Sequence, residues 1–218
     1  MNGKNIRAAL SAALSITALA GLATTIGTGQ AQADGCTAVQ VISARGTGEP
    51  LGFAPQLGTV VGNPVYNAIN KKLTASSSPY RVDYPASATQ LNSISLGNTD
   101  LVNHIIEQAT SCPNQSFVLV GYSQGAFVVE NSLGVPTYTS WGSKIIPGWV
   151  EPKIKAVLLF GNPIGANGGR VTGTYAARTL DICHDGDPVC DPNGNNVNQH
   201  TNYGQDAGRA AQFAVDRL

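Results

Sequence analysis

Apolar residues along the chain occur in short unbroken runs and in runs with helical spacing. Phe117–Gly121 and Lys155–Gly161 are apolar almost without alternation, which is typical of strands that are buried on both faces of a parallel sheet. Further strand-like runs occur at Val39–Ser43, Arg81–Tyr84 and Arg178–Ile182.

Helical spacing occurs between these strands. In Thr99–Thr110 apolar residues recur at positions 101, 105, 106 and 109, and Thr99 is expected to cap the helix, with Asp100 at its positive end. Further helices are predicted at Gln124–Leu133 and Asp206–Leu218. Because strands and helices alternate, the sequence predicts an α/β fold with a mostly parallel sheet. Stretches rich in Gly, Asn and Pro are predicted to be loops, which carry sites in such folds: Gly161–Thr174 and Asp185–Gln199.

The first part of the chain has the composition of an export signal. Lys4 and Arg7 precede a long stretch without charge that ends in Ala31-Gln32-Ala33, the small-x-small pattern that signal peptidases cleave. We therefore expect residues 1–33 to be a secretory signal peptide and residues 34–218 to form the exported domain. A membrane anchor is the alternative, but Gly, Ser and Thr interrupt the apolar run.

The remaining chain is long enough for one domain with a substantial core. The signal removes two of the 13 basic residues, so 11 remain against 13 acidic ones, and no basic cluster occurs. Nucleic acid is therefore not expected as a partner. Only 12% of the residues are charged, which favours an exported protein that acts on an uncharged or insoluble substrate.

Four cysteines lie in the predicted exported domain: Cys36, Cys112, Cys183 and Cys190. Export and an even number of cysteines predict two disulfides. Cys183 and Cys190 lie close together in a Gly/Pro/Asp segment, which favours a small closed loop and leaves Cys36 to pair with Cys112. A metal site is the alternative, and it is disfavoured because the chain has no CxxC pair and only three histidines.

The most specific chemical signal is Gly121-Tyr122-Ser123-Gln124-Gly125. It follows an apolar strand and precedes a helical run, which is the context of a nucleophile elbow. Ser123 is thus predicted to be a nucleophile lifted above the sheet, and the glycines leave room where strand and helix crowd each other. The backbone N–H of Gln124, at the helix start, is expected to face a developing oxyanion.

An elbow serine needs a base, and in this fold the base follows both the serine and an acid along the chain. His104 precedes Ser123 and falls inside a predicted helix, so a structural role is expected for it. His184 follows Ser123 but precedes most of the candidate acids, whereas His200 follows all of them. His200 is therefore the preferred base, with His184 as the alternative.

Spacing alone leaves the acid open among Asp181, Asp185, Asp187 and Asp191. Asp181 ends a predicted strand. Asp185 and Asp187 lie inside the predicted Cys183–Cys190 loop, where a cross-link would hold a carboxylate well for fixing one tautomer of the imidazole. Because Asp favours turns, three of the four are expected to be turn residues.

A second oxyanion donor is expected from the loop after the first strand, residues 44–49, which reads Ala-Arg-Gly-Thr-Gly-Glu. Thr47 lies between two glycines, so its backbone N–H and its hydroxyl are candidate donors. An ordinary glycine-rich turn explains the pattern equally well. The motif is not a dinucleotide site, because the third glycine and the following helix start are missing.

Together these motifs resemble the cutinase family of serine hydrolases. The residues that carry the resemblance are Arg45-Gly46-Thr47, the elbow, Gly186-Asp187-Pro188-Val189-Cys190 and His200. The likeness runs through nearly all of the predicted exported domain, including the four cysteines. It implies a small, lidless α/β-hydrolase with a sheet of about five mostly parallel strands, without a metal or a cofactor.

The resemblance also implies roles for individual residues. It makes Ser123 the nucleophile, Asp187 the acid and His200 the base. It builds the oxyanion hole from Thr47 and the Gln124 backbone. It supports the same two disulfides, Cys36–Cys112 and Cys183–Cys190.

The resemblance extends to two groups of the family that act on different substrates. Cutinases and cutinase-like enzymes cleave cutin, short triglycerides and synthetic polyesters, whereas acetylxylan esterases of the same family deacetylate xylan. The opening Arg-Gly-Thr-Gly-Glu-Pro is similar to the first group, and the tail from Asp187 to Gly204 is also similar to the second, although that group's extra disulfides are missing. In the loop Asp191–Gln199, Val197 is the only large apolar side chain, which favours short acyl groups or a sugar on the alcohol side.

We therefore expect a secreted, monomeric serine esterase that hydrolyses short-to-medium acyl esters or polyesters such as cutin. One alternative is an acetylxylan esterase that acts on acetylated polysaccharide, and another is a secreted binding protein without turnover on the same scaffold. The apolar segment Trp141–Pro147, with Trp149 nearby, is expected to pack in the core, and a patch for substrate adsorption is the alternative.

Overall fold

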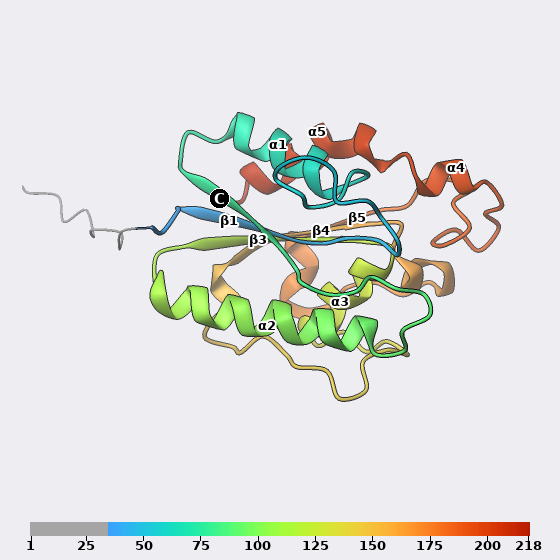
Figure 1. Ribbon diagram of the computed structural model, residues 1–218, viewed down its shortest axis with the longest axis horizontal. Helices are drawn as coiled ribbons and strands as arrows, with labels where there is room; N and C mark the ends of the chain where they lie inside the picture. Colours follow the sequence, from blue (N-terminus) through green and yellow to red (C-terminus); the bar gives the residue numbers. More distant parts are fainter. Residues whose placement is uncertain (1–34) are drawn as a thin grey trace, which may run out of the picture. The chain divides into compact units, whose positions relative to one another are not determined.

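A single parallel sheet organises the computed structural model, which describes residues 35–218. The strands lie in the order β2-β1-β3-β4-β5 (Figure 1). Their bounds are β1 (Val39–Ala44), β2 (Ser77–Arg81), β3 (Ser116–Tyr122), β4 (Ile154–Phe160) and β5 (Thr179–Ile182). The predicted α/β fold with a parallel sheet is confirmed. The predicted signal peptide, residues 1–33, lies outside the described residues.

The central strands β3 and β4 are buried on both faces. All but one residue of each strand is buried, which is why both read as unbroken apolar runs. The predicted strands Phe117–Gly121 and Lys155–Gly161 lie within one residue of the observed bounds.

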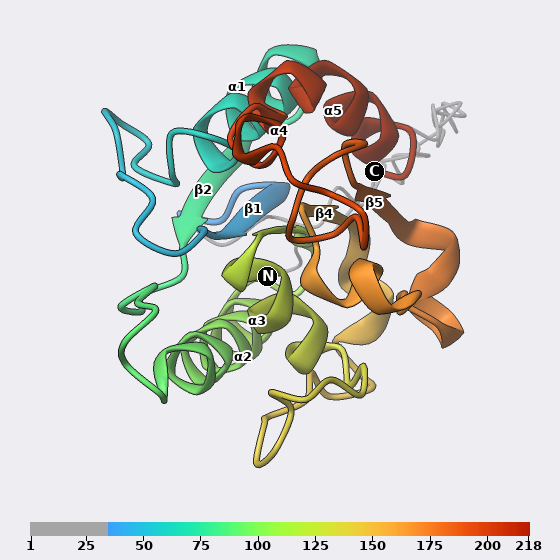
Figure 2. The ribbon, with the colours of Figure 1, turned by 90° about the vertical axis from the view of Figure 1, so that its right-hand side faces the viewer.

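Helices cover both faces of the sheet. The helices α1 (Gly62–Lys72) and α5 (Ala207–Val215) lie on one face, and α2 (Ser93–Ser111) and α3 (Gln124–Ser132) lie on the other (Figures 1 and 2). Successive side chains of β1 point to opposite faces of the sheet, so the core has two halves. Val41 packs in the half covered by α1 and α5, and Ile42 packs in the half covered by α2 and α3. Within residues 35–218 no helix combines the length and apolarity that a bilayer span requires.

The predicted strand Arg81–Tyr84 is wrong in position. The observed strand β2 ends at Arg81 and pairs with β1 from Ser77 onward. Its sequence, Ser-Ser-Pro-Tyr-Arg, carries no apolar run because β2 is an edge strand that is only partly buried. An edge position also tolerates the proline, which has no N–H for the ladder.

The predicted helix Thr99–Thr110 starts too late. Helix α2 begins at Ser93, so Thr99 lies inside the helix and does not cap it. The carboxylate of Asp100 accepts a hydrogen bond from the Tyr80 hydroxyl. The first turns bury small or polar residues, which give no apolar signal: Ser93, Gly97 and Asn98.

The sequence patterns did not predict helix α1. Only Val65 and Ile69 bury large side chains on its inner face, so the apolar stripe is narrow. The helix begins with Gly62-Asn63-Pro64, which reads as a turn in the sequence although proline is well tolerated in a first turn.

Both predicted disulfides are present. Cys36–Cys112 links the segment before β1 to the end of α2, and Cys183–Cys190 closes a short loop after β5. No cysteine in residues 35–218 is free. The short loop holds the candidate acids Asp185 and Asp187.

The expected core packing of the Trp141–Pro147 segment is wrong for most of its apolar residues. Trp141 is 97% exposed, Ile145 is 59% exposed and Trp149 is 53% exposed, whereas Ile146 is only 4% exposed. The N–H of Ile146 donates to the carbonyl of Ser132. The loop after α3 is thus anchored through Ile146 while its tryptophans face outward.

Helix α3 carries a fully buried carboxyl group, Glu130. Its Oε1 accepts a hydrogen bond of 2.8 Å from Asn162, whose amide nitrogen also donates to Asp181. Its Oε2 has no partner in the described part of the chain. Burial raises the pKa of Glu130 from 4.5 to about 8, so this carboxyl group is protonated in the folded protein at neutral pH.

The raised pKa predicts a pH-dependent stability. The unfolded chain releases this proton above pH 4.5 and the folded protein only above about pH 8, so the free energy of unfolding should fall as pH rises between these values. Glu130→Gln, which stays neutral, should reduce that slope, and Glu107→Gln on the exposed face of α2 should not. Urea unfolding followed by circular dichroism measures both slopes. Equal slopes in wild type and Glu130→Gln would contradict this assignment.

Candidate active site

Ser123 sits on a sharp turn between β3 and α3, at the edge of the sheet that faces the viewer in Figure 2. Its φ of +52° and ψ of −117° are rare for a residue with a side chain. Its N–H donates to the carbonyl of Phe160 at 2.9 Å, which ties the turn to β4. The turn thus presents the Ser123 hydroxyl beyond the carboxyl end of the sheet.

The two glycines of the elbow are required by close packing. A Cβ atom on Gly125 would lie 1.9 Å from the carbonyl oxygen of Ala44, and one on Gly121 would lie 2.7 Å from the carbonyl oxygen of Gly125. Any side chain at either position would displace α3 from β1 and β3.

The structure brings Ser123, His200 and Asp187 into one hydrogen-bonded chain. His200, at the end of α4 (Val197–His200), has Nε2 2.9 Å from the Ser123 hydroxyl oxygen and Nδ1 2.8 Å from Asp187 Oδ2. Ser123 is partly exposed, whereas Asp187 is fully buried. A proton can therefore pass from the accessible Ser123 hydroxyl to the His200 imidazole, whose orientation is fixed by the buried carboxylate of Asp187.

Further hydrogen bonds hold the Asp187 carboxylate. Its Oδ1 accepts from the Val189 N–H at 2.8 Å, and its Oδ2 accepts from the Tyr203 hydroxyl at 2.5 Å. Burial and the contact with Asp187 raise the pKa of Tyr203, so its hydroxyl remains a donor. Tyr203 has no exposed surface, and the only sequence signal for it is its spacing of three residues from His200.

The other candidate histidines lie outside this chain of contacts. His184 Nε2 lies 2.7 Å from an oxygen of Asp206. His104, on α2, lies 2.9 Å from Gln40 and stacks on Tyr80. Burial lowers the pKa of His104 to about 4, so this histidine is neutral and structural, as its position in the sequence predicts.

The other candidate acids are also held elsewhere. Asp191 accepts hydrogen bonds from the N–H groups of Gly186 and Asn193, which is turn chemistry. Asp181 bonds to Asn162, and Asp185 is exposed in the disulfide loop. Residues 35–218 contain no group of three or more acidic, His or Cys residues arranged for a metal ion.

Thr47 and Gln124 adjoin Ser123 from two different elements. A Cβ atom on Gly46 would lie 3.4 Å from the Ser123 Cβ and 2.6 Å from the Tyr122 ring, so the loop that carries Thr47 is pressed against the elbow. Gln124 is the first residue of α3, where backbone N–H groups have no partner within the helix. These positions fit donors to an oxyanion beside Ser123.

The Gln124 side chain fixes the start of α3. Its amide nitrogen donates to the carbonyl of Ser87 at 3.0 Å, and its Oε1 accepts from the Ser93 hydroxyl at 2.9 Å. The loop before α2 is thereby joined to the elbow.

Glu49 holds the loop that carries Thr47, and sequence reasoning did not single it out. The side chain is buried and its Oε2 accepts from the Gly46 N–H at 2.8 Å. Its Oε1 accepts from the N–H groups of Val60 at 2.7 Å and Val61 at 3.4 Å, just before α1. Burial raises the pKa of Glu49. The available signal was an acidic residue placed directly after Gly-Thr-Gly.

Two further residues seat His200. Gly161, with a φ of +52°, leaves space for the imidazole, because a Cβ atom there would lie 2.8 Å from His200 Cε1. The Tyr122 hydroxyl donates to the His200 carbonyl at 2.7 Å. Both the ring and the backbone of His200 are therefore held in place.

Comparison with known proteins identifies the family of the chain. The cutinase family model matches residues 35–218. The chain belongs to the cutinase family. It is accordingly an ester hydrolase, and cutinase-family esterases typically act through a serine.

Individual relatives agree with this membership. A cutinase of Kineococcus radiotolerans is 39% identical over 71% of this chain, and the match spans 52% of that protein, about half its length. A probable carboxylesterase of Mycobacterium tuberculosis, Culp3, is 36% identical over 85% of this chain and 71% of that protein. The solved structure of a Trichoderma reesei cutinase with a phosphonate inhibitor is 34% identical, with a TM-score of 0.66 over 85% of this chain and 78% of that one.

The contacts of Glu49 predict a defect in this cutinase-family esterase that is confined to turnover. Glu49→Gln keeps the shape but leaves one buried N–H facing an amide N–H, which costs about 1–3 kcal/mol and loosens the Thr47 loop. We expect kcat to fall about tenfold with KM changed less than about twofold. Steady-state hydrolysis of p-nitrophenyl butyrate measures both, with Glu107→Gln as the matched control. A rise in KM at constant kcat would assign Glu49 to substrate binding instead.

Proposed function

We propose that this cutinase-family protein hydrolyses carboxylic esters through an acyl-enzyme on Ser123. The observation that supports the proposal is the hydrogen-bonded chain from Ser123 through His200 to Asp187. As the Ser123 oxygen attacks the ester carbonyl, His200 Nε2 takes its proton, and Asp187 holds the proton on Nδ1.

The negative charge that develops on the carbonyl oxygen is stabilised by the backbone N–H groups of Thr47 and Gln124. One such donor typically lowers the barrier by about 2.7–4 kcal/mol. The imidazolium of His200 then protonates the leaving alcohol, and the acyl group remains on Ser123. A water molecule gives a proton to His200, attacks the acyl carbon and releases the acid, which restores the serine.

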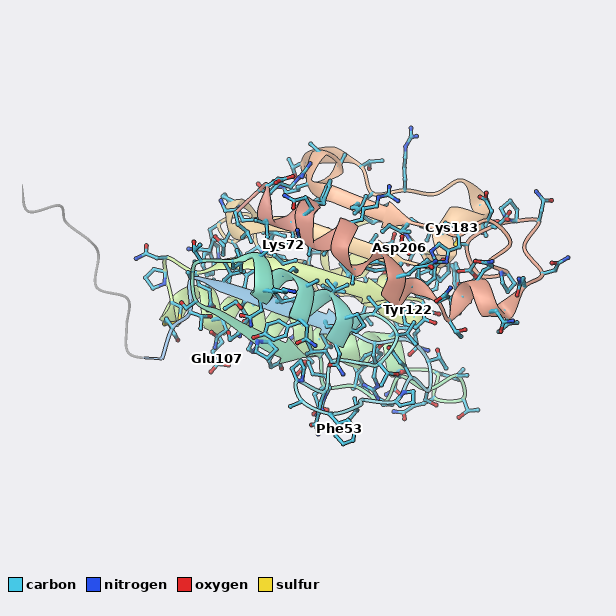
Figure 3. All side chains as sticks on the ribbon, turned by 90° about the horizontal axis from the view of Figure 1, so that it is seen from above. Phe53, Lys72, Glu107, Tyr122, Cys183 and Asp206 are labelled. Carbon is cyan, nitrogen blue, oxygen red and sulfur yellow. A yellow bond between two sulfur atoms is a disulfide. The ribbon has the colours of Figure 1, made fainter. Side chains whose placement is uncertain are left out.

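The proposed substrate is a short-to-medium acyl ester, including esters within a polymer such as cutin or a synthetic polyester. Phe53 (Figure 3) and Leu91 support this substrate, because they are 95% and 103% exposed. They lie on the loops that follow β1 and β2 at the edge of the sheet that carries Ser123. Apolar side chains in such a place suit contact with an insoluble ester.

We further propose that the protein is exported as a monomer after cleavage of residues 1–33. Support comes from the composition of that segment and from the two disulfides, which form and persist in oxidising compartments.

Deacetylation of xylan is the second candidate. The observation that favours it is the largely exposed, polar segment Asp191–Gln199 before His200, in which Val197 alone is large and apolar. A polar rim offers little burial for a long acyl chain and can hydrogen-bond a sugar.

A chain-length series tests the nucleophile and the substrate together. Residues 34–218 and the Ser123→Ala variant are assayed on p-nitrophenyl acetate, butyrate, hexanoate and palmitate. We expect maximal wild-type activity at butyrate or hexanoate and a loss of at least about a thousandfold in Ser123→Ala. Ser95→Ala, an exposed serine of α2, should behave as wild type.

Two other results would change the assignment. Activity confined to acetate, together with release of acetate from acetylated xylan, selects the second candidate. A fluorophosphonate probe should label wild type and not Ser123→Ala. An unlabelled wild type would overturn the proposed mechanism and favour a binding protein without turnover.

A further inference from the structure

A second histidine lies directly behind the His200–Asp187 pair. His184 belongs to the loop closed by Cys183–Cys190. Its Nε2 lies 2.7 Å from Asp206 Oδ2, and its Nδ1 lies 3.0 Å from the carbonyl oxygen of Gln199. Cys183 and Asp206 are labelled at the same end of the molecule as Tyr122 in Figure 3. The side chains of His184 and Asp206 are only 13% and 18% exposed.

The two contacts of His184 join two segments of the chain. One ring nitrogen faces the carboxylate of Asp206, at the end of the turn before α5, and the other faces the carbonyl oxygen of Gln199, within α4. The ring therefore ties the backbone before His200 to the start of α5.

His184 touches the supports of both the base and the acid. Gln199, whose carbonyl accepts from Nδ1, is the residue directly before His200. The imidazole of His184 stacks on the Tyr203 ring with 4.1 Å between centroids, and its backbone N–H donates to the Tyr203 hydroxyl at 3.2 Å. That hydroxyl donates in turn to Asp187.

The ionisable surroundings of His184 come from two segments. Asp206 and Tyr203 face it from the turn before α5, Tyr203–Asp206. On its own loop, Asp185 follows it in the chain and is exposed, and Cys183 is held in the disulfide. Asp206 is thus the carboxylate that pairs with His184 in the described residues.

We propose that His184 and Asp206 are positioning residues of the esterase, and that their contact holds the backbone before His200 so that its imidazole reaches Ser123. The proposal rests on the proposed function of Ser123, His200 and Asp187. Loss of either contact of His184 releases the backbone before His200, so the cost should fall on turnover and not on substrate binding.

The decisive pair of variants is Asp206→Ala and Asp206→Asn. Alanine removes the partner of Nε2, whereas the asparagine side chain can still form a hydrogen bond with it. We expect kcat to fall about tenfold in His184→Ala and in Asp206→Ala, with KM within about twofold. Asp206→Asn should recover most of that loss.

Steady-state hydrolysis of p-nitrophenyl butyrate gives kcat and KM for wild type, the three variants and His104→Gln. The last is a matched control, since His104 is a partly buried, hydrogen-bonded histidine on α2. It should keep the wild-type kcat and KM. Circular dichroism checks that each variant is folded.

Two results would overturn the proposal. One is a wild-type kcat in folded Asp206→Ala, and the other is a kcat of Asp206→Asn as low as that of Asp206→Ala. Should His184→Ala fail to fold, the comparison of the two Asp206 variants still decides. Failure of the proposed function itself would show differently, as absence of fluorophosphonate labelling at Ser123 in wild type.

Discussion

The contact between the start of α3 and the carboxyl ends of β1 and β3 is the constraint on which the site depends. A Cβ atom on Gly125 would lie 1.9 Å from the Ala44 carbonyl oxygen, so α3 can come this close to β1 only because residue 125 is a glycine. This approach forces the rare backbone of Ser123 and aims its hydroxyl out of the sheet. It also sets Gly46 against the elbow, which brings the Thr47 loop within reach of the same point.

The groups around Ser123 come from loops and helix ends, and buried polar contacts fix these segments to the sheet layer. Glu49 joins the first loop to the start of α1. Tyr122 holds the backbone of His200, and Tyr203 holds the carboxylate of Asp187. Because a buried polar group without a partner is costly, each of these contacts narrows the choice of loop conformation. Asp187 is thus held by several hydrogen bonds although neither a helix nor a strand carries it.

The sequence predicts best what is decided locally. The unbroken apolar runs of β3 and β4 and the Gly-x-Ser-x-Gly turn reveal the sheet and Ser123, since burial on both faces and close packing leave few alternatives. Chain order indicates His200. It leaves the acid open, because Asp is common in turns and only the fold brings Asp187 beside the imidazole. Edge strand β2 and helix α1 are missed because they bury few apolar side chains. Glu49 and Tyr203 are missed because residue type alone does not reveal the buried hydrogen bonds that they make. Apolar composition misleads at Trp141, because an apolar side chain can also face solvent.

The outward-facing loop after α3 has a spectroscopic consequence. The chain contains two tryptophans, and both lie there, Trp141 at 97% and Trp149 at 53% exposure. Indole emission from the folded protein is therefore already that of water-exposed side chains and changes little when the core unfolds. The same property makes the intrinsic fluorescence a selective reporter of whatever settles on this loop, with no label added to the protein.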